Sequence, residues 1–430
     1  MSGLLVAAPQ SGSGKTVLTL ALLRALKAYG LDIGGAKAGP DFIDPGFHAL
    51  ASGRQSFNLD PWAMEPNRLR MLTRRVTASH VLIEGMMGLF DGAVDGTGSA
   101  ADLAQTLDVP VLLVVDAQKQ SHSIAALVRG FRDHRPGLHI CGVILNRTGS
   151  ERHELMLMEA VAAIGVPVLG AVRRDESLYL PERHLGLVQA GEANGIEAFI
   201  DNAAAIISRS LDLGKIAKAF GPIAPPAAKA GIVEPPGQVI AVARDAAFTF
   251  AYPHQFEDWR EAGANLSFFS PLGDETPYKC ADCIYLPGGY PELHAGRLSA
   301  AQGFRNGMQN AANAGVRIIG ECGGYMVLGE GLEDKDGVRH GMCGLLQLET
   351  SFAKRKLHLG YRELSGLAGG FGDRRFAAHE FHYSVALKEK GERLFSARDA
   401  LGADLGQCGL VSGNVCGSYM HLIEERGVGA

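Results

Sequence analysis

The first half of the chain alternates short apolar runs with stretches in which apolar residues recur at helical spacing. The apolar runs contain little polar alternation, which is typical of strands buried on both faces of a parallel sheet. We expect strands at residues 4–9, 80–85, 109–117, 139–147 and 166–172. Helices are expected between them, at residues 15–30, 123–134 and 152–165. This order of strands and helices predicts an α/β domain with helices on both faces of its sheet.

A proline-rich stretch interrupts this pattern. Residues 221–237 read GPIAPPAAKAGIVEPPG, and five prolines in seventeen residues are incompatible with a helix or a central strand. Beyond it the alternation begins again, with apolar runs at residues 238–245, 265–271, 282–289 and 316–324. We therefore predict two α/β domains, at residues 1–220 and 238–430, joined by a linker at residues 221–237.

Composition and charge narrow the class of protein. Lys and Arg number 41 against 46 for Asp and Glu, so the net charge is −5, without the basic excess of nucleic-acid binders. No apolar run approaches the ~20 residues that cross a bilayer, and the first residues lack the features of a secretory signal. Seven cysteines in 430 residues do not suggest a disulfide framework. We expect a cytoplasmic protein that binds neither nucleic acid nor a membrane.

A glycine-rich turn follows the first predicted strand. Residues 8–16 read APQSGSGKT and open the first helix, so backbone N–H groups and the helix dipole would point at an anion. Lys15 can reach the outer phosphates of a nucleotide, and the Thr16 hydroxyl can ligate Mg²⁺. The full P-loop pattern has glycine where this chain has Pro9, so the match is partial. The predicted phosphate site consists of Ser11, Gly12, Ser13, Gly14, Lys15 and Thr16.

Acidic residues lie near the ends of the strands that would carry this turn. Glu84 ends an apolar run, where a carboxylate without a partner would be costly, so we expect it to have a function. Asp41 and Asp44 stand in GPDFIDPGFH, and Asp91 follows in GLFDG. Because ligands of open α/β sheets gather outside the carboxyl ends of the strands, these acids are candidates for the metal and substrate sites. Aspartate before proline or glycine is also ordinary turn chemistry, so a structural role stays open for Asp44 and Asp91.

One cysteine stands on a sharp turn of the second domain. Residues 316–324 read VRIIGECGG, which predicts a strand, a tight turn at Cys322 and the start of a helix. Such an elbow exposes a thiol at the sheet edge, and the helix N-terminus should lower its pKa. The Gly323 N–H and a second donor near Gly289, in the loop LPGGYPE, could form an oxyanion hole. His421 in GSYMHLIEE is the candidate base, and a buried structural cysteine is the competing interpretation.

Several segments together resemble one enzyme family. The resemblance rests on KAGPDFIDP, EGMMGLFDG, PERHLGL, VARDAAFTF, PGGYPE, GECGGYM, HEFHYS and GSYMHL, which span nearly the whole chain except the linker. These segments are similar to parts of the cobyrinic acid and hydrogenobyrinic acid a,c-diamide synthases of cobalamin biosynthesis. Enzymes of that family join a P-loop domain similar to dethiobiotin synthetase to a class I, triad-type glutamine amidotransferase domain. They use ATP, Mg²⁺ and L-glutamine to amidate the a and c acetate side chains of the corrin ring.

The resemblance implies roles for particular residues. Cys322 would attack the side-chain amide of glutamine and release ammonia, with His421 as acid and base. ATP would bind at the P-loop, with Asn146 in GVILNR on the adenine, and would convert a carboxylate into an acyl phosphate. The implied metal ligands are Thr16, Asp41 and Glu84. A polycarboxylate substrate needs cations, for which the candidates are Lys37, Arg183 and His184, and Asp44 and Asp91 are further polar candidates.

One position departs from the triad pattern. Triad amidotransferases usually carry Glu two residues after the histidine, where this chain has Ile423. The a,c-diamide synthase type also tends to lack that Glu. The residue that orients His421 is therefore unassigned, and Glu424 and Glu380 are both candidates.

Other functions compete with this interpretation. Cobyric acid synthase amidates other corrin carboxylates, and nickel-sirohydrochlorin a,c-diamide synthase has the same architecture; GPDFIDP and the short N-terminal domain favour the a,c enzyme over the former. We favour metal-free hydrogenobyrinate slightly over cobyrinate, although no motif specifies the ring metal. A P-loop switch ATPase with a degenerate second domain would not need to keep both Cys322 and His421. A homodimer is a further expectation.

Overall fold

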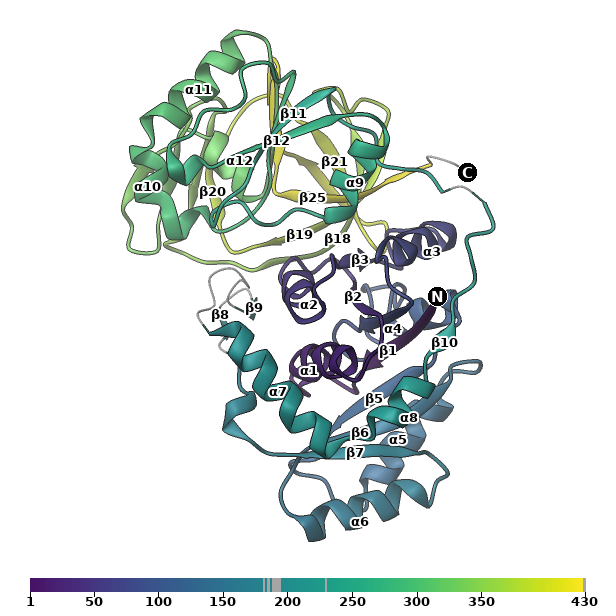
Figure 1. The fold of residues 1–430 in the computed structure, drawn as a ribbon. Helices are drawn as coiled ribbons and strands as arrows, with labels where there is room; N and C mark the ends of the chain where they lie inside the picture. Colours follow the sequence, from purple (N-terminus) through teal and green to yellow (C-terminus); the bar gives the residue numbers. More distant parts are fainter. Residues whose placement is uncertain (181, 184–185, 188–194, 229, 428–430) are drawn as a thin grey trace. The chain divides into compact units, whose positions relative to one another are not determined.

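The computed structural model describes residues 1–430 except residues 181, 184–185, 188–194, 229 and 428–430. The chain divides into two compact units, Met1–Ala230 and Gly231–Ala430 (Figure 1). Each unit has its own sheets and its own buried apolar residues, in agreement with the two predicted α/β domains. Among the described residues, no helix is both long enough and apolar enough to span a bilayer.

The first unit is built on one mostly parallel sheet. Across this sheet the strands are β3 (Phe57–Leu59), β2 (Ile33–Ala38), β4 (His80–Glu84), β1 (Ser2–Ala7), β5 (Val111–Asp116), β6 (Ile140–Thr148) and β7 (Val168–Arg173). The short strand β10 (Gly221–Pro222) pairs antiparallel with β1, and β8 (Glu182–Arg183) pairs with β9 (Gly186–Leu187) elsewhere. The central strands are buried along most of their length, as their continuous apolar runs predict.

Helices cover both faces of this sheet. One group contains α1 (Lys15–Ala28), α2 (Asp44–Ser52), α7 (Ile196–Ser210) and α8 (Leu213–Lys218). The other contains α3 (Pro66–Arg75), α4 (Ala100–Leu107), α5 (Ile124–Asp133) and α6 (Glu151–Ala162), and the 3₁₀ helix η1 (Glu176–Leu178) follows β7. Right-handed crossovers between parallel strands place the two groups on opposite faces. Serine side chains begin two of these helices, Ser99 at α4 and Ser150 at α6.

The proline-rich stretch is anchored at both ends. Its first two residues form β10 beside β1. Further along, the Ala227 N–H donates to the Asn67 side chain of the first unit at 3.0 Å. The Val233 N–H donates to the Asp258 carboxylate of the second unit at 2.9 Å. The boundary between the two units therefore lies inside the proline-rich stretch.

The second unit contains a parallel sheet like that of the first. Across it the strands are β12 (Asn265–Phe269), β11 (Val239–Ala243), β13 (Cys283–Leu286), β14 (Arg317–Glu321), β24 (Val415–Ser418) and β23 (Leu410–Ser412), with β23 antiparallel to β24. Its helices are α9 (Pro253–Glu261), α10 (Ala295–Ala300), α11 (Gln302–Asn313) and α12 (Gly323–Leu328), with 3₁₀ helices η2 (Pro271–Gly273) and η3 (Pro291–His294).

Two further sheets of this unit are not indicated by the apolar runs. The five-stranded antiparallel sheet consists of β22 (Asp404–Cys408), β21 (Phe395–Asp399), β18 (His358–Gly366), β19 (Arg375–His382) and β25 (Met420–Arg426). The four-stranded sheet consists of β16 (Arg339–Gly341), β15 (Gly331–Glu333), β17 (Leu348–Ser351) and β20 (Val385–Glu389). An apolar core joins the parallel sheet to the five-stranded sheet. Because β25 follows β24 after a single residue, the chain passes from one sheet to the other beside the end of β14.

Candidate active sites

The glycine-rich turn of the first unit has a fixed conformation between β1 and α1. Gly12 and Gly14 have positive φ angles of 77° and 88°, a region that residues with a side chain rarely adopt. The Asn146 side chain of β6 donates to the Ser13 carbonyl oxygen at 2.9 Å. The backbone angle of Gly14 favours glycine, and a β-carbon there would lie 2.3 Å from Nδ2 of Asn146 and would displace that side chain. The turn therefore has the defined shape that a phosphate cradle requires.

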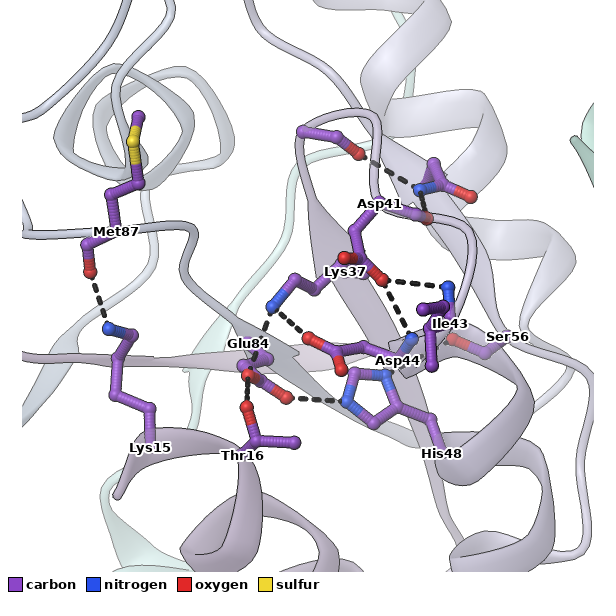
Figure 2. Close-up of polar contacts among 12 residues, drawn as sticks. Lys15, Thr16, Lys37, Asp41, Ile43, Asp44, His48, Ser56, Glu84 and Met87 are labelled. Atoms are coloured by element: carbon purple, nitrogen blue, oxygen red, sulfur yellow. Dashed lines mark hydrogen bonds and ion pairs between the residues drawn. The ribbon is translucent and has the colours of Figure 1, made fainter. Parts of the chain in front are cut away.

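Lys15 is the first residue of α1, and its ammonium group is turned toward the loop that follows β4. It donates a hydrogen bond to the Met87 carbonyl oxygen (Figure 2). Burial lowers the pKa of Lys15 to about 8, while Glu84 raises this pKa and Lys37 lowers it further. The positive charge of Lys15 is therefore lost on mild alkalinisation.

Glu84 ends β4 at the centre of a buried polar cluster (Figure 2). Its Oε1 accepts hydrogen bonds from the Thr16 hydroxyl at 2.6 Å and from the Lys37 ammonium at 3.0 Å. Its Oε2 lies 2.7 Å from Nε2 of His48. Lys37 also forms an ion pair with Asp44. Glu84, Lys37 and His48 expose at most 5% of their surface, so these contacts are shielded from water.

Strand register explains how the cluster forms. Lys37 of β2 and Val6 of β1 are the two neighbours of Glu84 in the parallel ladder. The P-loop that follows β1 and the loop that follows β2 therefore meet at the carboxyl edge of the sheet. Asp44 and His48 are one helical turn apart on α2, so both face this edge.

Charge pairing keeps Glu84 and Lys37 ionised despite their burial, whereas burial raises the pKa of Asp44 well above its usual range. Burial alone would raise the pKa of Glu84, but Lys37, His48 and Thr16 hold that pKa well below its usual range. Burial also disfavours the charge on Lys37, and Asp44 and Glu84 raise its pKa above the usual value. Removing Glu84 or Lys37 would therefore leave buried charge that the remaining groups compensate only in part.

Two other predicted acids shape the backbone close by. Asp41 accepts the N–H groups of Ile43 at 2.8 Å and of Asp44 at 2.7 Å, at the start of α2. Asp91 accepts the Gly88 N–H at 2.9 Å in the loop after β4. These contacts are the turn chemistry that the sequence left open for Asp91, and they occupy carboxylate oxygens of both residues.

A cavity of about 450 Å³ adjoins the P-loop. Its lining includes Gly14, Asn146, Arg147, Arg173, Arg174 and Tyr179. The volume lies within the range of small-molecule sites, and Asn146, the predicted adenine contact, is part of the wall. Of the cationic candidates for the substrate, Lys37 lies in the Glu84 cluster, Arg183 lies in β8, and His184 lies outside the described residues.

Cys322 stands on a strained turn between β14 and α12. Its φ of 46° and ψ of −102° are values that a residue with a side chain rarely adopts. The Cys322 N–H donates to the Ser418 carbonyl oxygen at 2.8 Å. A β-carbon at Gly324 would lie 2.0 Å from the Leu286 carbonyl oxygen, so only glycine allows the turn to pack this closely. The geometry is that of the predicted nucleophile elbow.

Gly288, just after β13, lies against both Cys322 and His421. A β-carbon at Gly288 would lie 2.4 Å from Cε1 of His421 and 3.3 Å from Cβ of Cys322. The predicted nucleophile and the predicted base therefore meet at this glycine. A β-carbon at Gly323 would lie 3.0 Å from the Gly289 nitrogen, so the two predicted oxyanion donors are also close together. This arrangement can support nucleophilic attack on a carbonyl group.

Both reactive groups are buried and uncharged at neutral pH. Cys322 exposes 3% of its surface and His421 exposes 1%. Burial raises the pKa of the Cys322 thiol, and Glu292 raises it further. Burial lowers the pKa of His421 to about 3, with additional lowering by His379 and His382. The expected lowering of the thiol pKa by the helix N-terminus is therefore wrong, because desolvation of the thiolate outweighs the dipole of the short helix α12.

Three carboxylates, each on a different strand, are candidates for the group that orients His421. Oε2 of Glu321, the last residue of β14, lies 4.0 Å from Nδ1 of His421. Glu380 forms an ion pair with Arg362 at 2.6 Å. Glu424 lies further along β25, the strand that carries His421. The structure thus adds Glu321 to the two candidate acids that the sequence nominated.

Known proteins match both units of the chain. Residues 4–188 match the CobQ/CobB/MinD/ParA nucleotide binding domain, and residues 239–427 match the CobB/CobQ-like glutamine amidotransferase domain. The hydrogenobyrinate a,c-diamide synthase of Brucella anthropi is 57% identical over 433 residues, and the match covers 99% of each chain. The chain belongs to this family. The synthase of the same name from Sinorhizobium sp is 55% identical over 437 residues, covering 99% of this chain and 100% of the relative.

Membership in the hydrogenobyrinate a,c-diamide synthase family confirms the predicted combination of domains. The chain is a glutamine-dependent amidoligase with a nucleotide-binding domain. The matched nucleotide-binding segment contains the P-loop and Glu84, and the matched amidotransferase segment contains Cys322 and His421. The alternative of a switch ATPase with a degenerate second domain has no further support.

Sequence reasoning missed several residues of both sites. His48 stands one helical turn after Asp44 in DPGFH, and that spacing could have placed it beside Glu84. Glu321 ends an apolar strand, which is the same signal that singled out Glu84. Gly288 has no such signal, because its importance arises from the packing of His421 against the loop after β13.

We expect nucleotide affinity to fall as the pH rises through about 8. Below that pH Lys15 carries the charge that attracts phosphate, and above it the free protein must take up a proton in order to bind. Calorimetry with a non-hydrolysable ATP analogue should show a dissociation constant that increases between about pH 7 and pH 9.5. Lys15→Arg stays charged over this range, so its affinity should change much less. The same pH dependence in both proteins would contradict this prediction.

We expect Gly288→Ala to lower the glutaminase activity of this enzyme by about 100-fold. The new β-carbon would displace the His421 ring from Cys322, and a misplacement of about 1 Å can reduce a rate about 100-fold. Glutamate release should fall by that factor, whereas amidation driven by ammonium chloride should continue. Gly296→Ala is the control, because its β-carbon would meet nothing closer than 3.9 Å. Wild-type glutamate release in Gly288→Ala would show that the two side chains do not act together.

Proposed function

We propose that this chain is a hydrogenobyrinate a,c-diamide synthase, which converts the a and c acetate carboxylates of a metal-free corrin ring into amides. The proposal rests mainly on the match of nearly the whole chain, at 55% and 57% identity, to synthases of that name. Two features of the structure support it. One unit has a phosphate cradle beside the Glu84 cluster, and the other has a cysteine and a histidine that meet at Gly288.

The amidotransferase unit supplies ammonia. Cys322 attacks the side-chain carbonyl carbon of glutamine while His421 takes the thiol proton. His421 then gives that proton to the departing nitrogen, so ammonia leaves and a glutamyl thioester remains. Water attacks the thioester, His421 removes its proton and returns it to sulfur, and glutamate leaves. The N–H groups of Gly323 and Gly289 stabilise the negative charge on the carbonyl oxygen in both steps.

The nucleotide-binding unit offers groups that fit ATP and Mg²⁺. Backbone N–H groups of residues 11–16 would bind the phosphates. Asn146 lines the adjoining cavity, where the adenine would bind. Mg²⁺ prefers oxygen ligands. The oxygens of Thr16 and Glu84, which lie close together at the carboxyl edge of the sheet, would bind it together with Asp41. When bound, Mg²⁺ neutralises charge on the β- and γ-phosphates.

Activation of the carboxylate prepares it for ammonia. A carboxylate oxygen of the substrate attacks the γ-phosphorus of ATP, ADP leaves, and an acyl phosphate forms. Ammonia attacks the acyl carbon, phosphate leaves, and the amide remains after loss of a proton. Lys15 and Lys37 would supply positive charge to the phosphoryl group and the carboxylate, on which negative charge collects during the transfer. Arg183 and His184 are proposed to bind other carboxylates of the ring. Asp44 and Asp91 are proposed to keep the polar groups that they contact, Lys37 and the Gly88 N–H, in position.

The ring metal is the feature of the substrate that needs a direct test. The wild-type enzyme is given hydrogenobyrinate, cobyrinate or nickel-sirohydrochlorin with ATP, Mg²⁺ and glutamine, and amide products are quantified by mass spectrometry. We expect kcat/KM for hydrogenobyrinate to exceed the others by about tenfold or more. A higher kcat/KM for either of the metal-containing substrates would overturn the substrate assignment and leave the amidoligase assignment intact.

A further inference from the structure

Ile423 occupies the position where triad amidotransferases carry the glutamate that orients the histidine. Its side chain is fully buried and has no polar atom. An imidazole that gains a proton during catalysis is normally held at its other nitrogen by an acid, which fixes the tautomer and stabilises the imidazolium. In this chain such an acid would come from another position.

Glu321 is within reach of His421. The distance between Oε2 of Glu321 and Nδ1 of His421 is 4.0 Å, and the two side chains expose 8% and 1% of their surface. This distance is longer than a hydrogen bond, and catalytic hydrogen bonds are often long before the substrate binds. If Nδ1 faces Glu321, Nε2 is the nitrogen left to exchange a proton with Cys322.

The backbone holds this geometry. Glu321 of β14 lies beside Ser418 of β24 in the parallel ladder. The Cys322 N–H donates to the carbonyl oxygen of the same serine at 2.8 Å. The Met420 N–H donates to the hydroxyl of that serine at 3.2 Å, and His421 is the next residue. Acid, thiol and imidazole are therefore fixed around one residue, Ser418.

The Glu321 carboxyl can lie in a buried position because burial keeps it protonated. Burial raises the pKa of the Glu321 carboxyl to about 8, with Tyr285 and the Leu422 backbone opposing the rise. At neutral pH the carboxyl is therefore protonated beside a neutral imidazole, and no unpaired charge is buried. Positive charge on His421 would favour ionisation of this carboxyl, since opposite charges at this distance stabilise one another.

Glu424 is the strongest rival. A register shift between Ala377 and Ala378 lets Ile423 bulge, so Glu424 falls on the same side of β25 as His421. Its side chain is only half-buried, so its charge would be better screened than that of Glu321. Glu380, the other sequence candidate, already pairs with Arg362.

We propose that Glu321 is the positioning residue that orients His421 for proton exchange with Cys322. This inference rests on the proposed role of these two residues in glutamine hydrolysis. The positioning acid then directly precedes the nucleophile in the sequence Glu321-Cys322, in place of the usual position two residues after the histidine.

The test compares Glu321→Gln and Glu321→Asp with the wild type, as full chains with ATP, Mg²⁺ and hydrogenobyrinate. In Glu321→Gln, kcat for glutamine hydrolysis should fall about 100-fold, short of the ~10⁴-fold known for loss of the orienting acid in serine proteases. KM for glutamine should change less than about twofold, and ammonia-driven amidation should be unchanged. Glu321→Asp keeps the acid and should recover part of kcat. Glu363→Gln, an exposed acid of β18, should match the wild type.

Several outcomes would overturn the proposal. Wild-type kcat in Glu321→Gln would do so, and so would a loss of kcat in Glu424→Gln with Glu321→Gln unaffected. A large rise in KM together with a lower unfolding temperature, and no recovery in Glu321→Asp, would indicate a structural role instead. Glutamine-driven amidation in Cys322→Ser would show that the proposed glutaminase site has failed, which is a separate result from failure of the Glu321 assignment.

Discussion

Cys322→Ser is expected to lose glutamine-driven amidation and to keep amidation driven by free ammonia. A serine hydroxyl is a far weaker nucleophile in a site where even the thiol is held neutral by burial. The glutamine-driven rate should fall by about 10³-fold or more, as expected when a covalent nucleophile is removed. Free ammonia bypasses this step, because it attacks the acyl phosphate directly. Both rates are measured on the same preparation by mass spectrometry of the amide product.

The serine variant is suited to this separation because it changes little else. Serine has nearly the size of cysteine, so the elbow with its φ of 46° can keep its shape. Cys280→Ser, at an exposed cysteine of the same unit, is the matched control and should retain both rates. A Cys322→Ser protein that uses glutamine normally would remove Cys322 from the mechanism, and loss of both rates would indicate that the fold was damaged.

Glu84→Gln is expected to lose amidation from either nitrogen source. The carboxylate of Glu84 accepts from Thr16 and Lys37 and contacts His48, and an amide cannot replace its charge. Loss of a buried ionic partner typically costs about 3–5 kcal/mol, and the free energy of unfolding should fall by that amount in chemical denaturation. At a temperature where the variant is folded, ammonia-driven amidation should fall by about 100-fold or more.

The choice of nitrogen source separates this variant from Cys322→Ser. Ammonia restores amidation when the defect lies in glutamine hydrolysis, and it does not when the defect lies in carboxylate activation. Glu159→Gln, at an exposed glutamate of α6, should keep the stability and both rates of the wild type. Full ammonia-driven activity in Glu84→Gln would exclude the Glu84 cluster from carboxylate activation.

Continuous apolar runs made much of the fold predictable. The runs at residues 4–9, 80–85 and 109–117 became β1, β4 and β5, and the predicted order of strands and helices holds in both units. β2 was missed because its sequence, IGGAKA, contains two glycines and resembles a loop. The antiparallel sheets of the second unit were missed because a strand such as β18 alternates buried with more exposed positions and carries no continuous apolar run.

The candidate sites were predictable where the chemistry is local. The turn before Lys15 and the elbow at Cys322 are encoded by glycines next to the functional residue. The contacts of His48 with Glu84 and of His421 with Glu321 depend on elements that are distant in sequence. Dependence on residues that are distant in sequence also explains why the pKa of the Cys322 thiol was expected to be lowered but is raised. A sequence shows which residue begins a helix, whereas burial of Cys322 arises from residues brought together by folding.

The central claim is that nitrogen released from glutamine by one unit of this chain enters carboxylates activated by the other. The most direct test gives the wild-type enzyme hydrogenobyrinate, ATP, Mg²⁺ and glutamine labelled with nitrogen-15 in its side-chain amide. We predict a diamide in which both new amide nitrogens carry the label, seen as the corresponding shift in mass. An unlabelled diamide would contradict the transfer, and ATP hydrolysis with no amide from either glutamine or ammonia would contradict the ligase reaction itself.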